Sequence, residues 1–293
     1  MPNFEEWYIP TFEQNVNYAL QQKNSLLVPT VKTVPCTGEK TSTRYMNDFE
    51  LEERTEKFGN TRMSQADFEL RWITTKIFDK AFPIIEEDVE KALTDPTSDF
   101  TANAVFAANR CKDARIIAAL GGSVQTGRVD NITTTAYDSN QVIDVTTGST
   151  NASNVGMNEK KIRAAKRMFD EAEIDPADRR IILISPYQSD EMLDILHFTS
   201  ADYTDDRVIR EGVFKRALGF DFIVTNLLPL SSGIRMSFAY TTNSMAFTQR
   251  GGFSAKSAEL PEHNFERVIQ FKLQPGAARR YDKGVIKIPC AEA

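Results

Sequence analysis

The sequence contains few of the residues that carry most enzyme chemistry and metal binding. It has only two histidines, His197 and His263, and three cysteines that lie far apart, Cys36, Cys111 and Cys290. Widely spaced cysteines in an odd number argue against a disulfide framework or a thiolate metal site, and they are typical of a reducing compartment. Neither histidine is followed four residues later by a second histidine or a carboxylate, as on a metal-binding helix. The sequence therefore predicts neither a metal nor a cofactor.

Nucleotide-binding and hydrolase motifs are also missing. The stretch GGSVQTG at 121–127 contains no Gly-Lys-Ser/Thr, and GFSAK at 252–256 lacks the second glycine of a nucleophile elbow. An excess of basic charge is absent too, because the net charge is −6 and the pI is near 5.2. This balance opposes general affinity for the phosphates of nucleic acid. These absences count against a soluble α/β enzyme, which stays open as an alternative class.

The chain has no long apolar run and no export signal. No stretch approaches the ~20 apolar residues of a membrane-spanning helix. The N-terminal MPNFEEWYIPTFEQ is acidic and aromatic, unlike a secretory signal peptide. With 41% hydrophobic and 26% charged residues in 293, the composition is globular and the length suits a large core in two domains or subdomains.

The first 30 residues predict an arm. Residues 1–10 are extended and aromatic, and Thr11 with Gln14 forms a capping box for a helix over 11–24. The aromatic side chains of such an arm are expected to pack against another surface. Either its own domain or a neighbouring molecule can supply that surface, and we favour the neighbour.

A long β-hairpin follows over 31–82. Phe68, Leu70 and Trp72 alternate with charged residues in its second strand, and its tip is polar and charged. A two-stranded hairpin is barely stable alone, and the sequence offers no adjacent third strand. We therefore expect the hairpin to lie on another surface.

Helical periodicity is strongest between 97 and 121, after a short amphipathic helix expected over 84–94. Small residues recur there at spacings of three and four, and Gly121 stands where a left-handed C-cap belongs. We expect the stripe of small residues to let another element approach closely. Residues 121–157 are rich in Gly, Thr, Asn and Ser, and they predict a long loop with a strand near 142–145.

The second half begins with a compact α/β unit. A helix over 158–173 leads to the buried strand RRIILIS, after which Ser185, Pro186 and Gln188 begin a second helix that runs to about His197. A strand over 220–228 completes the unit, with Gly219 allowing a tight turn before it and Pro229 ending it. Further strands follow to the C-terminus.

The charges on the helix over 158–173 oppose its dipole. Basic residues lie near its start and acidic residues near its end, at a cost of about 0.3–1 kcal/mol for each charge. Either this is a solvated face that tolerates the arrangement, or both ends meet charged partners. Both interpretations stay open, with the first slightly ahead.

Four stretches, taken in order, resemble major capsid proteins of tailed phages with the Hong Kong 97 fold. They are RRIILISPYQSDEMLDILHFTSADY, FKRALGFDFIVTNLLP, MSFAYTTNSMAFTQ and GAARRYDKGVIKI. Thr242 and Asn243 stand where the third stretch usually carries His or Lys. The order of the elements along the chain is also similar to that family.

The resemblance implies an α+β fold of the Hong Kong 97 type and a division of the chain into five parts. These are an N-terminal arm over 1–30, an E-loop hairpin over 31–82, a peripheral domain over 83–156 with a spine helix over 97–121, an axial domain over 157–232, and returning peripheral strands over 233–293.

The implied function is that of a coat protein, not an enzyme. Copies of the chain would assemble into pentamers and hexamers of an icosahedral head around double-stranded DNA, which it would contact only non-specifically. Portal and decoration proteins are further implied partners. A separate scaffolding protein is also expected, because the arm begins almost at Met1. The implied location is the virion capsid, with synthesis and assembly in the bacterial cytoplasm. An encapsulin-type compartment shares the fold and is the main alternative.

Contacts between subunits are expected from the arm, the hairpin tip and the axial domain. The candidate residues are Trp7, Tyr8, Glu50, Glu52, Glu53, Arg54, Glu56, Lys57, Lys160, Arg163, Lys215 and Arg216.

Overall fold

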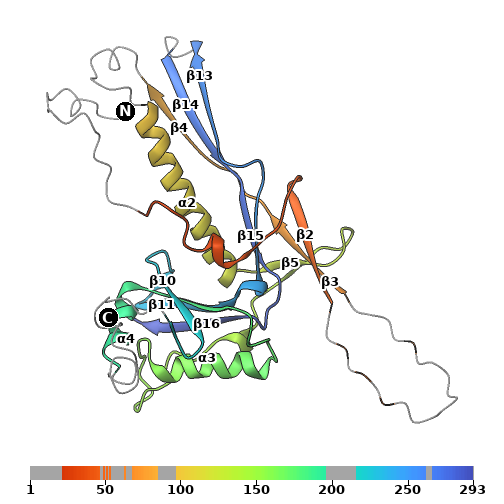
Figure 1. Ribbon diagram of the computed structural model, residues 1–293, viewed down its shortest axis with the longest axis vertical. Helices are drawn as coiled ribbons and strands as arrows, with labels where there is room; N and C mark the ends of the chain where they lie inside the picture. Colours follow the sequence, from red (N-terminus) through yellow and green to blue (C-terminus); the bar gives the residue numbers. More distant parts are fainter. Residues whose placement is uncertain are drawn as a thin grey trace.

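The protein is an α+β molecule with three visibly different parts, as the computed structural model in Figure 1 shows. A globular lobe lies at one end, a long arm of helix and sheet extends from it, and a β-hairpin projects from their junction. The structure describes residues 22–46, 49, 51, 53, 63, 68–84, 97–195, 216–261 and 266–292. The expected arm residues 1–21 and most of the short helix over 84–94 lie outside these ranges, and residues 22–24 are not helical.

A six-stranded sheet forms the centre of the lobe. Strand β7 (Arg180–Ile184) pairs in parallel with β9 (Phe220–Val224), as the predicted α/β unit requires. On its other side β7 pairs antiparallel with β11 (Ile234–Thr241), which also pairs with β16 (Val285–Ala291). The short strands β8 (Arg216–Ala217) and β10 (Leu230–Ser231) lie beside β9 and β11. Two of the C-terminal strands therefore complete the sheet that the α/β unit begins.

Among the described residues, two helices belong to the lobe, and their first residues match the sequence signals. Helix α3 (Glu159–Glu171) begins after Asn158, whose side chain accepts a hydrogen bond from the backbone of Lys161. Helix α4 (Pro186–Leu193) begins with the predicted capping box between Ser185 and Gln188. The end expected near His197 lies outside the described residues.

The sheet is buried on both faces. On one face Ile182, Ile184 and Phe220 pack under α3, where the rings of Phe169 and Phe220 are 5.9 Å apart. On the other face Ile181 and Leu183 contact the spine helix. Successive side chains of a strand point to opposite faces, so the unbroken apolar run of β7 fits this double burial.

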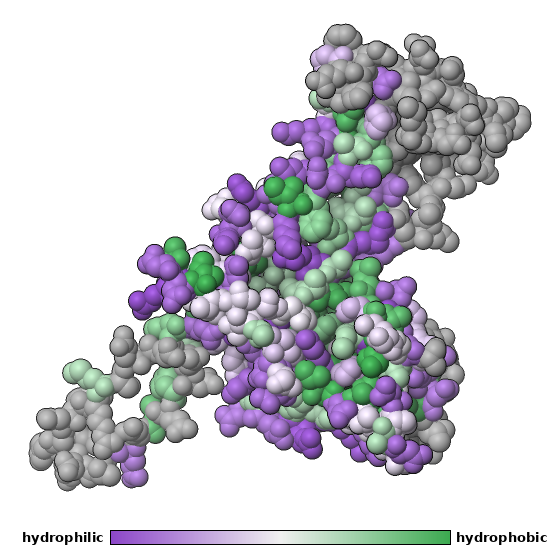
Figure 2. All heavy atoms as spheres, turned by 180° about the vertical axis from the view of Figure 1, so that it is seen from behind, coloured by the Kyte–Doolittle hydropathy of each residue, from purple (hydrophilic) through white to green (hydrophobic). Residues whose placement is uncertain are grey.

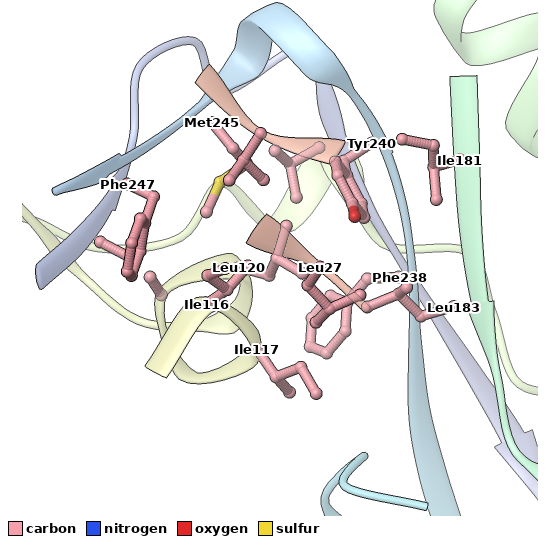
Figure 3. Packing of buried hydrophobic residues seen from close by; sticks show 14 of the residues in the cluster. Leu27, Ile116, Ile117, Leu120, Ile181, Leu183, Phe238, Tyr240, Met245 and Phe247 are labelled. Atoms are coloured by element: carbon pink, nitrogen blue, oxygen red, sulfur yellow. The ribbon is translucent and has the colours of Figure 1, made fainter. Parts of the chain in front are cut away.

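The spine helix α2 (Thr97–Gly121) has the predicted bounds, but its buried face and its C-cap differ from the prediction. Ile116, Ile117 and Leu120 enter the core with Leu27 and Phe238 (Figure 3). The stripe of small residues is not this face, because Ala107, Ala114 and Ala118 are exposed. Gly121 does not adopt the expected left-handed conformation. Instead, a Cβ added there would lie 3.1 Å from the ring of Phe238, so the glycine allows a close approach.

The remaining strands of the body form two three-stranded sheets. The arm sheet consists of β13 (Ser254–Leu260), β14 (Glu266–Leu273) and β4 (Phe78–Ile84), all antiparallel, and α2 runs along it (Figure 1). Near the lobe, β12 (Met245–Gln249) pairs with β15 (Pro275–Arg279) and with the two-residue β1 (Lys32–Thr33). The one-turn helices η2 (Val28–Thr30) and η4 (Thr242–Ser244) lie next to this second sheet.

The hairpin pairs as predicted, but it has more strands than expected. Strands β2 (Lys40–Met46) and β3 (Phe68–Thr74) are antiparallel. A third strand, β5 (Val124–Thr126), pairs with β3, and β6 (Thr133–Thr135) pairs with β5. The predicted long loop therefore supplies two strands and η3 (Ser139–Gln141), whereas the strand expected near 142–145 is reduced to one bridge between Val142 and Lys287.

Candidate assembly surfaces

The hairpin turns its charged face inward and its apolar face outward. The expected apolar face begins at Phe68, which is 62% exposed, and Leu70 and Trp72 are only half-buried. On the opposite face Arg71 and Ile73 are buried. Burying an arginine while exposing a phenylalanine is unfavourable unless each side chain has a partner, so both faces need an explanation.

The partner of Arg71 is Asp282, in the turn between β15 and β16. The guanidinium donates hydrogen bonds of 2.8 and 2.6 Å to the two carboxylate oxygens. It also donates to the hydroxyl of Tyr45 at 3.1 Å, and that hydroxyl donates to Glu69. The ring of Tyr45 meets Tyr281 edge to face. These contacts fix the hairpin stem to the body of the protein.

The same aspartate reaches the spine helix through Arg279, which is fully buried. Arg279 donates to Asp282 at 3.0 Å and to the carbonyl oxygens of Ala119 and Leu120 at 3.3 and 3.2 Å. The last carbonyls of a helix lack partners within it and carry partial negative charge, so a cation is favourable there. Arg279 therefore replaces the glycine C-cap that the sequence suggests.

The surroundings of Asp282 and Arg71 favour the charged form of each residue. Burial alone raises the pKa of Asp282, but hydrogen bonds and charges from Arg71 and Arg279 more than offset it and hold the pKa below its ordinary value. Burial alone lowers the pKa of Arg71, and Asp282 reverses this so that the net shift is upward. The hairpin, the spine helix and the β15–β16 turn are thus joined by one ion-pair network, which we call the Asp282 junction.

A second buried carboxylate holds the base of the N-terminal arm. Asp113 on α2 accepts hydrogen bonds from the side chains of Gln22 and Ser25, both at 2.5 Å. It also accepts from the backbone nitrogens of Leu26 and Leu27 at 3.0 and 3.2 Å. Asp113 itself is almost fully buried. Four donors on one carboxylate fix where residues 22–27 leave the body.

Several charges of α3 have partners within the chain. Arg163 pairs with Glu159, and Asp170 accepts a 2.8 Å hydrogen bond from the buried Arg180. Lys161, which the sequence suggests is solvated, is fully buried, and its ammonium donates to the carbonyl oxygens of Val155 and Pro289 at 2.7 and 2.8 Å. Because Asp170 is paired and Lys161 is buried, the charged residues of α3 do not all lie on a face exposed to solvent.

The structure places four of the predicted contact residues. Glu53, Lys160 and Arg163 are exposed, and Arg216 is exposed with its Nε 3.6 Å from a carboxylate oxygen of Asp221. They lie on the hairpin tip, on α3 and on β8, so the described residues do not form one cluster. The others lie outside the described residues, namely Trp7, Tyr8, Glu50, Glu52, Arg54, Glu56, Lys57 and Lys215.

Sequence reasoning missed the residues that organise these surfaces. Arg71, Asp113, Lys161, Arg279 and Asp282 are scattered over the chain, and each has at least one partner that lies far from it in sequence. The one local signal is a charge within or at the end of an apolar stretch, such as Arg71 in LRWI and Arg279 in GAAR. Such a charge must either face solvent or be paired, and a sequence without coordinates does not distinguish the two.

An apolar groove of about 350 Å³ lies between α2 and the arm sheet. Phe78 and Phe82 of β4 and Phe271 and Leu273 of β14 line one side, and α2 lines the other with residues that include Ala107 and Cys111. Within the described residues no group of His, Cys, Asp and Glu could hold a metal ion. In the same part of the chain, no helix is long and apolar enough to cross a membrane.

The chain is similar in structure to several solved capsids. The capsid structure of cyanophage P-SCSP1u has a TM-score of 0.72 at 13% identity, with 99% of this chain and 94% of that chain covered. The capsid of cyanophage Pam1 has a TM-score of 0.70 at 12% identity, covering 97% and 96%. The capsid of a native GTA particle has a TM-score of 0.70 at 8% identity, covering 96% and 95%. At such low identity the likeness establishes the fold, and it confirms the expected Hong Kong 97-type class.

A family profile described as phage capsid protein matches residues 4–292. No curated protein sequence matches the chain significantly. The chain therefore belongs to the phage capsid protein family. It is a major capsid protein, and with further copies of itself it forms the shell of the phage head.

Proposed function

We propose that the subunits associate head to tail into pentamers and hexamers, which form an icosahedral shell around double-stranded DNA. The observation that carries this proposal is the hairpin, which projects from the body (Figure 2). On this hairpin Met46, Phe49 and Phe68 are exposed. A large exposed apolar side chain is stable in a monomer only at a cost, and several on one projection are typical of an interface. Head-to-tail contacts of one kind close into rings when the rotation permits.

The proposed parts of the subunit keep the boundaries expected from the sequence. The axial domain over 157–232 lies at the ring centre. Within the hairpin region 31–82, the projecting strands β2 and β3 lie on the adjacent subunit. The arm over 1–30 contacts a neighbour, and 83–156 with 233–293 forms the peripheral domain. Strand β11 pairs with β7, and β16 pairs with β11, which supports a firm connection between the axial and peripheral parts.

The twelve predicted contact residues remain candidates for these interfaces. Arg163 has an exposed guanidinium beside Glu159, and Arg216 lies at the edge of the central sheet beside Asp221, so both can exchange partners on assembly. Exposed ion pairs are each worth only about 0–1 kcal/mol, which suits a shell that must correct errors as it grows.

The chain is proposed to act without catalysis, with scaffolding, portal and decoration proteins as its other partners. Assembly takes place in the bacterial cytoplasm, and packaged DNA is contacted only non-specifically. The net charge of −6 supports weak contact with DNA, because strong binding to phosphates needs a basic surface.

Electron microscopy of the protein expressed alone and with its candidate scaffolding protein tests the proposal. Closed shells with rings of five and six are the expected result. Persistent monomers under both conditions would contradict self-assembly. Shells enclosing a cellular enzyme in place of DNA would favour the encapsulin-type compartment.

A further inference from the structure

The exposed face of helix α3 is divided into a basic half and an acidic half. In the first half the exposed charged residues are all basic, namely Lys160, Arg163, Lys166 and Arg167. The one acid of this half, Glu159, has a side chain that is only 19% exposed. From residue 170 to residue 175 the exposed charged residues are all acidic, namely Asp170, Glu171, Glu173 and Asp175. The two groups therefore lie at opposite ends of a helix that is about 20 Å long.

Only part of this charge is balanced within the chain. Three ion pairs involve the face, namely Arg163–Glu159, Arg167–Glu171 and Asp170–Arg180. Among the described residues, Lys160 and Lys166 have no acidic partner and Glu173 has no basic partner. The pair of Arg167 and Glu171 is exposed on both sides, so its members can exchange partners at little cost.

Glu173 occupies a position where glycine would be more stable. Its backbone has a positive φ of 52°, the left-handed conformation that follows the end of many helices. The amide of Ile174 donates back to the carbonyl oxygen of Phe169 at 3.2 Å, as in a Schellman motif. A Cβ is disfavoured in this conformation, and a carboxylate at this end of a helix opposes the dipole. Two local costs at one exposed residue favour a role for its charge in a contact outside the chain.

Helix α3 is placed so that its ends can reach other subunits. It packs on one face of the central sheet, whereas α2 contacts the other face. On this side, remote from the spine helix, α3 runs across the lobe (Figure 1). In the proposed rings the lobe lies at the centre and the long arm points outward. A helix that runs across the lobe then has its two ends directed toward the two flanking subunits.

We infer that the basic end of α3 in one subunit pairs with the acidic end of α3 in the next subunit of the ring. Lys160 and Arg163 of one copy face Glu171 and Glu173 of its neighbour. Two different surfaces meet, so the contact is head to tail and repeats around the ring. Charges that oppose the dipole of their own helix thereby obtain partners of opposite sign. This inference rests on the proposed self-assembly and assigns a partner surface to the axial lobe.

An exchange of charge between the two ends tests the inference. Lys160→Glu/Arg163→Glu gives α3 two acidic ends, and Glu171→Lys/Glu173→Lys gives it two basic ends. Each variant is expected to reduce the shell yield, measured by sedimentation and electron microscopy, by roughly tenfold. The variant with all four substitutions has the unmodified net charge and opposite signs at the two ends, so its yield should return to within about twofold of the unmodified protein.

The outcomes separate this inference from the proposed function. If both two-site variants assemble normally, or if the four-site variant stays as poor as they are, the inference is overturned although self-assembly stands. Absence of shells from the unmodified protein would instead contradict the proposed function. A mixture of the two two-site variants should form rings of six but not of five, because acidic and basic copies can alternate only around an even ring. Dimers in place of rings would show a two-fold contact and overturn the head-to-tail arrangement.

Glu173→Gly provides a second test without charge reversal, which decides the matter if the exchanged variants do not fold. It removes the left-handed Cβ and the opposed charge, so the urea midpoint of the monomer should rise. Loss of the contact should nevertheless lower the shell yield by roughly threefold. Ala152→Gly is the matched control, because Ala152 is exposed and has a φ of 54° but no charge. It should raise the midpoint and leave the yield unchanged, and an unchanged yield for Glu173→Gly would overturn the inference.

Discussion

The guanidinium of Arg71 in the hairpin and the carboxylate of Asp282 in the β15–β16 turn form a two-pronged ion pair, with hydrogen bonds of 2.8 and 2.6 Å. The two residues are 211 positions apart in the sequence. Because Asp282 also accepts from Arg279, which bonds the last carbonyls of α2, the direction of the hairpin depends on the end of the spine helix. A shell protein that presents its hairpin to a neighbour needs such a fixed direction.

Removing the charge of Asp282 is expected to destabilise the subunit. Asp282→Asn keeps the shape, but it leaves Arg279 without an anion and leaves Arg71 paired only with Glu69. The expected cost is about 2–4 kcal/mol, which is below the range for a fully buried pair because Asp282 is 23% exposed. Urea unfolding of the monomer measures the loss. Arg163→Met, which removes an exposed pair on α3, is the control and should cost no more than about 1 kcal/mol. Equal losses of unfolding free energy in both variants would show that the Asp282 junction contributes no more than an exposed ion pair.

The ion pair between Asp282 and Arg71 also predicts that the subunit loses stability in acid. The folded-state pKa of Asp282 lies below the ordinary value of 3.8, so its stabilising contribution is present above that value and disappears as the pH falls through the folded-state pKa. The stability difference between the unmodified protein and Asp282→Asn should therefore be largest near neutral pH and shrink in the pH range below 3.8. Urea midpoints at pH 6 and at successively lower pH measure it. A difference that does not change with pH would exclude the carboxylate charge as its origin.

Replacing Asp113 is expected to release the base of the arm. Asp113→Ala removes the acceptor of four hydrogen bonds from residues 22–27, two of them from backbone nitrogens, and a buried donor left without a partner costs about 1–3 kcal/mol. Hydrogen exchange at the amides of Leu26 and Leu27 should become much faster while exchange in β7 is unchanged. Asp130→Ala, at an exposed turn position, is the control. Unchanged protection at Leu26 would contradict this role.

Reversing the acidic charges of the hairpin tip is expected to impair assembly without unfolding the subunit. Glu53 is exposed and Glu52 is its neighbour in the sequence, so Glu52→Lys/Glu53→Lys changes the charge presented to another molecule. Circular dichroism should be unchanged, and shell yield in light scattering should fall, with an increased dependence on salt. Normal particles from this double variant would count against the hairpin as an assembly element. Lys256→Glu, on the exposed strand β13, is a control for charge alone.

Local signals in the sequence predicted the elements that depend on local chemistry. The spine helix has its expected bounds because its 25 residues are rich in alanine and contain no proline and no glycine before Gly121. The Ser185–Gln188 box was recognisable from residue types and spacing alone. Gly219 has the positive φ of +85° that its place before β9 requires. These features need no information about distant parts of the chain.

Features that depend on distant partners could not be predicted. Strand β5 is three residues long, and its partner β3 lies about fifty positions earlier, so no local pattern marks the pair. The alternation around Phe68 was detected, but the buried face is the one with Arg71, which becomes favourable only through Asp282. The candidate site shows the same limit, because an interface between subunits is marked in one chain only by what that chain leaves exposed.

The buried thiol of Cys290 predicts a loss of stability in alkali. Burial raises the pKa of Cys290 from 9.0 to about 12, so the folded protein keeps a proton that the unfolded chain releases. Stability should fall as the pH rises above 9.0, by about 1.4 kcal/mol for one pH unit. Burial lowers the pKa of the neighbouring Lys161, which acts in the opposite direction, so the cysteine contribution must be isolated by substitution.

Cys290→Ala provides that isolation. When the pH is raised from 7.5 to 10 under reducing conditions, the free energy of unfolding of this variant should fall by about 1.4 kcal/mol less than that of the unmodified protein. The reason is that the variant has no thiol at position 290 to titrate in the unfolded chain. Cys36→Ala, at a half-exposed position, should keep the unmodified pH dependence. Urea unfolding at the two pH values measures both variants. Parallel pH profiles for Cys290→Ala and the unmodified protein would mean that the thiol and Lys161 titrate as a pair whose contributions cancel.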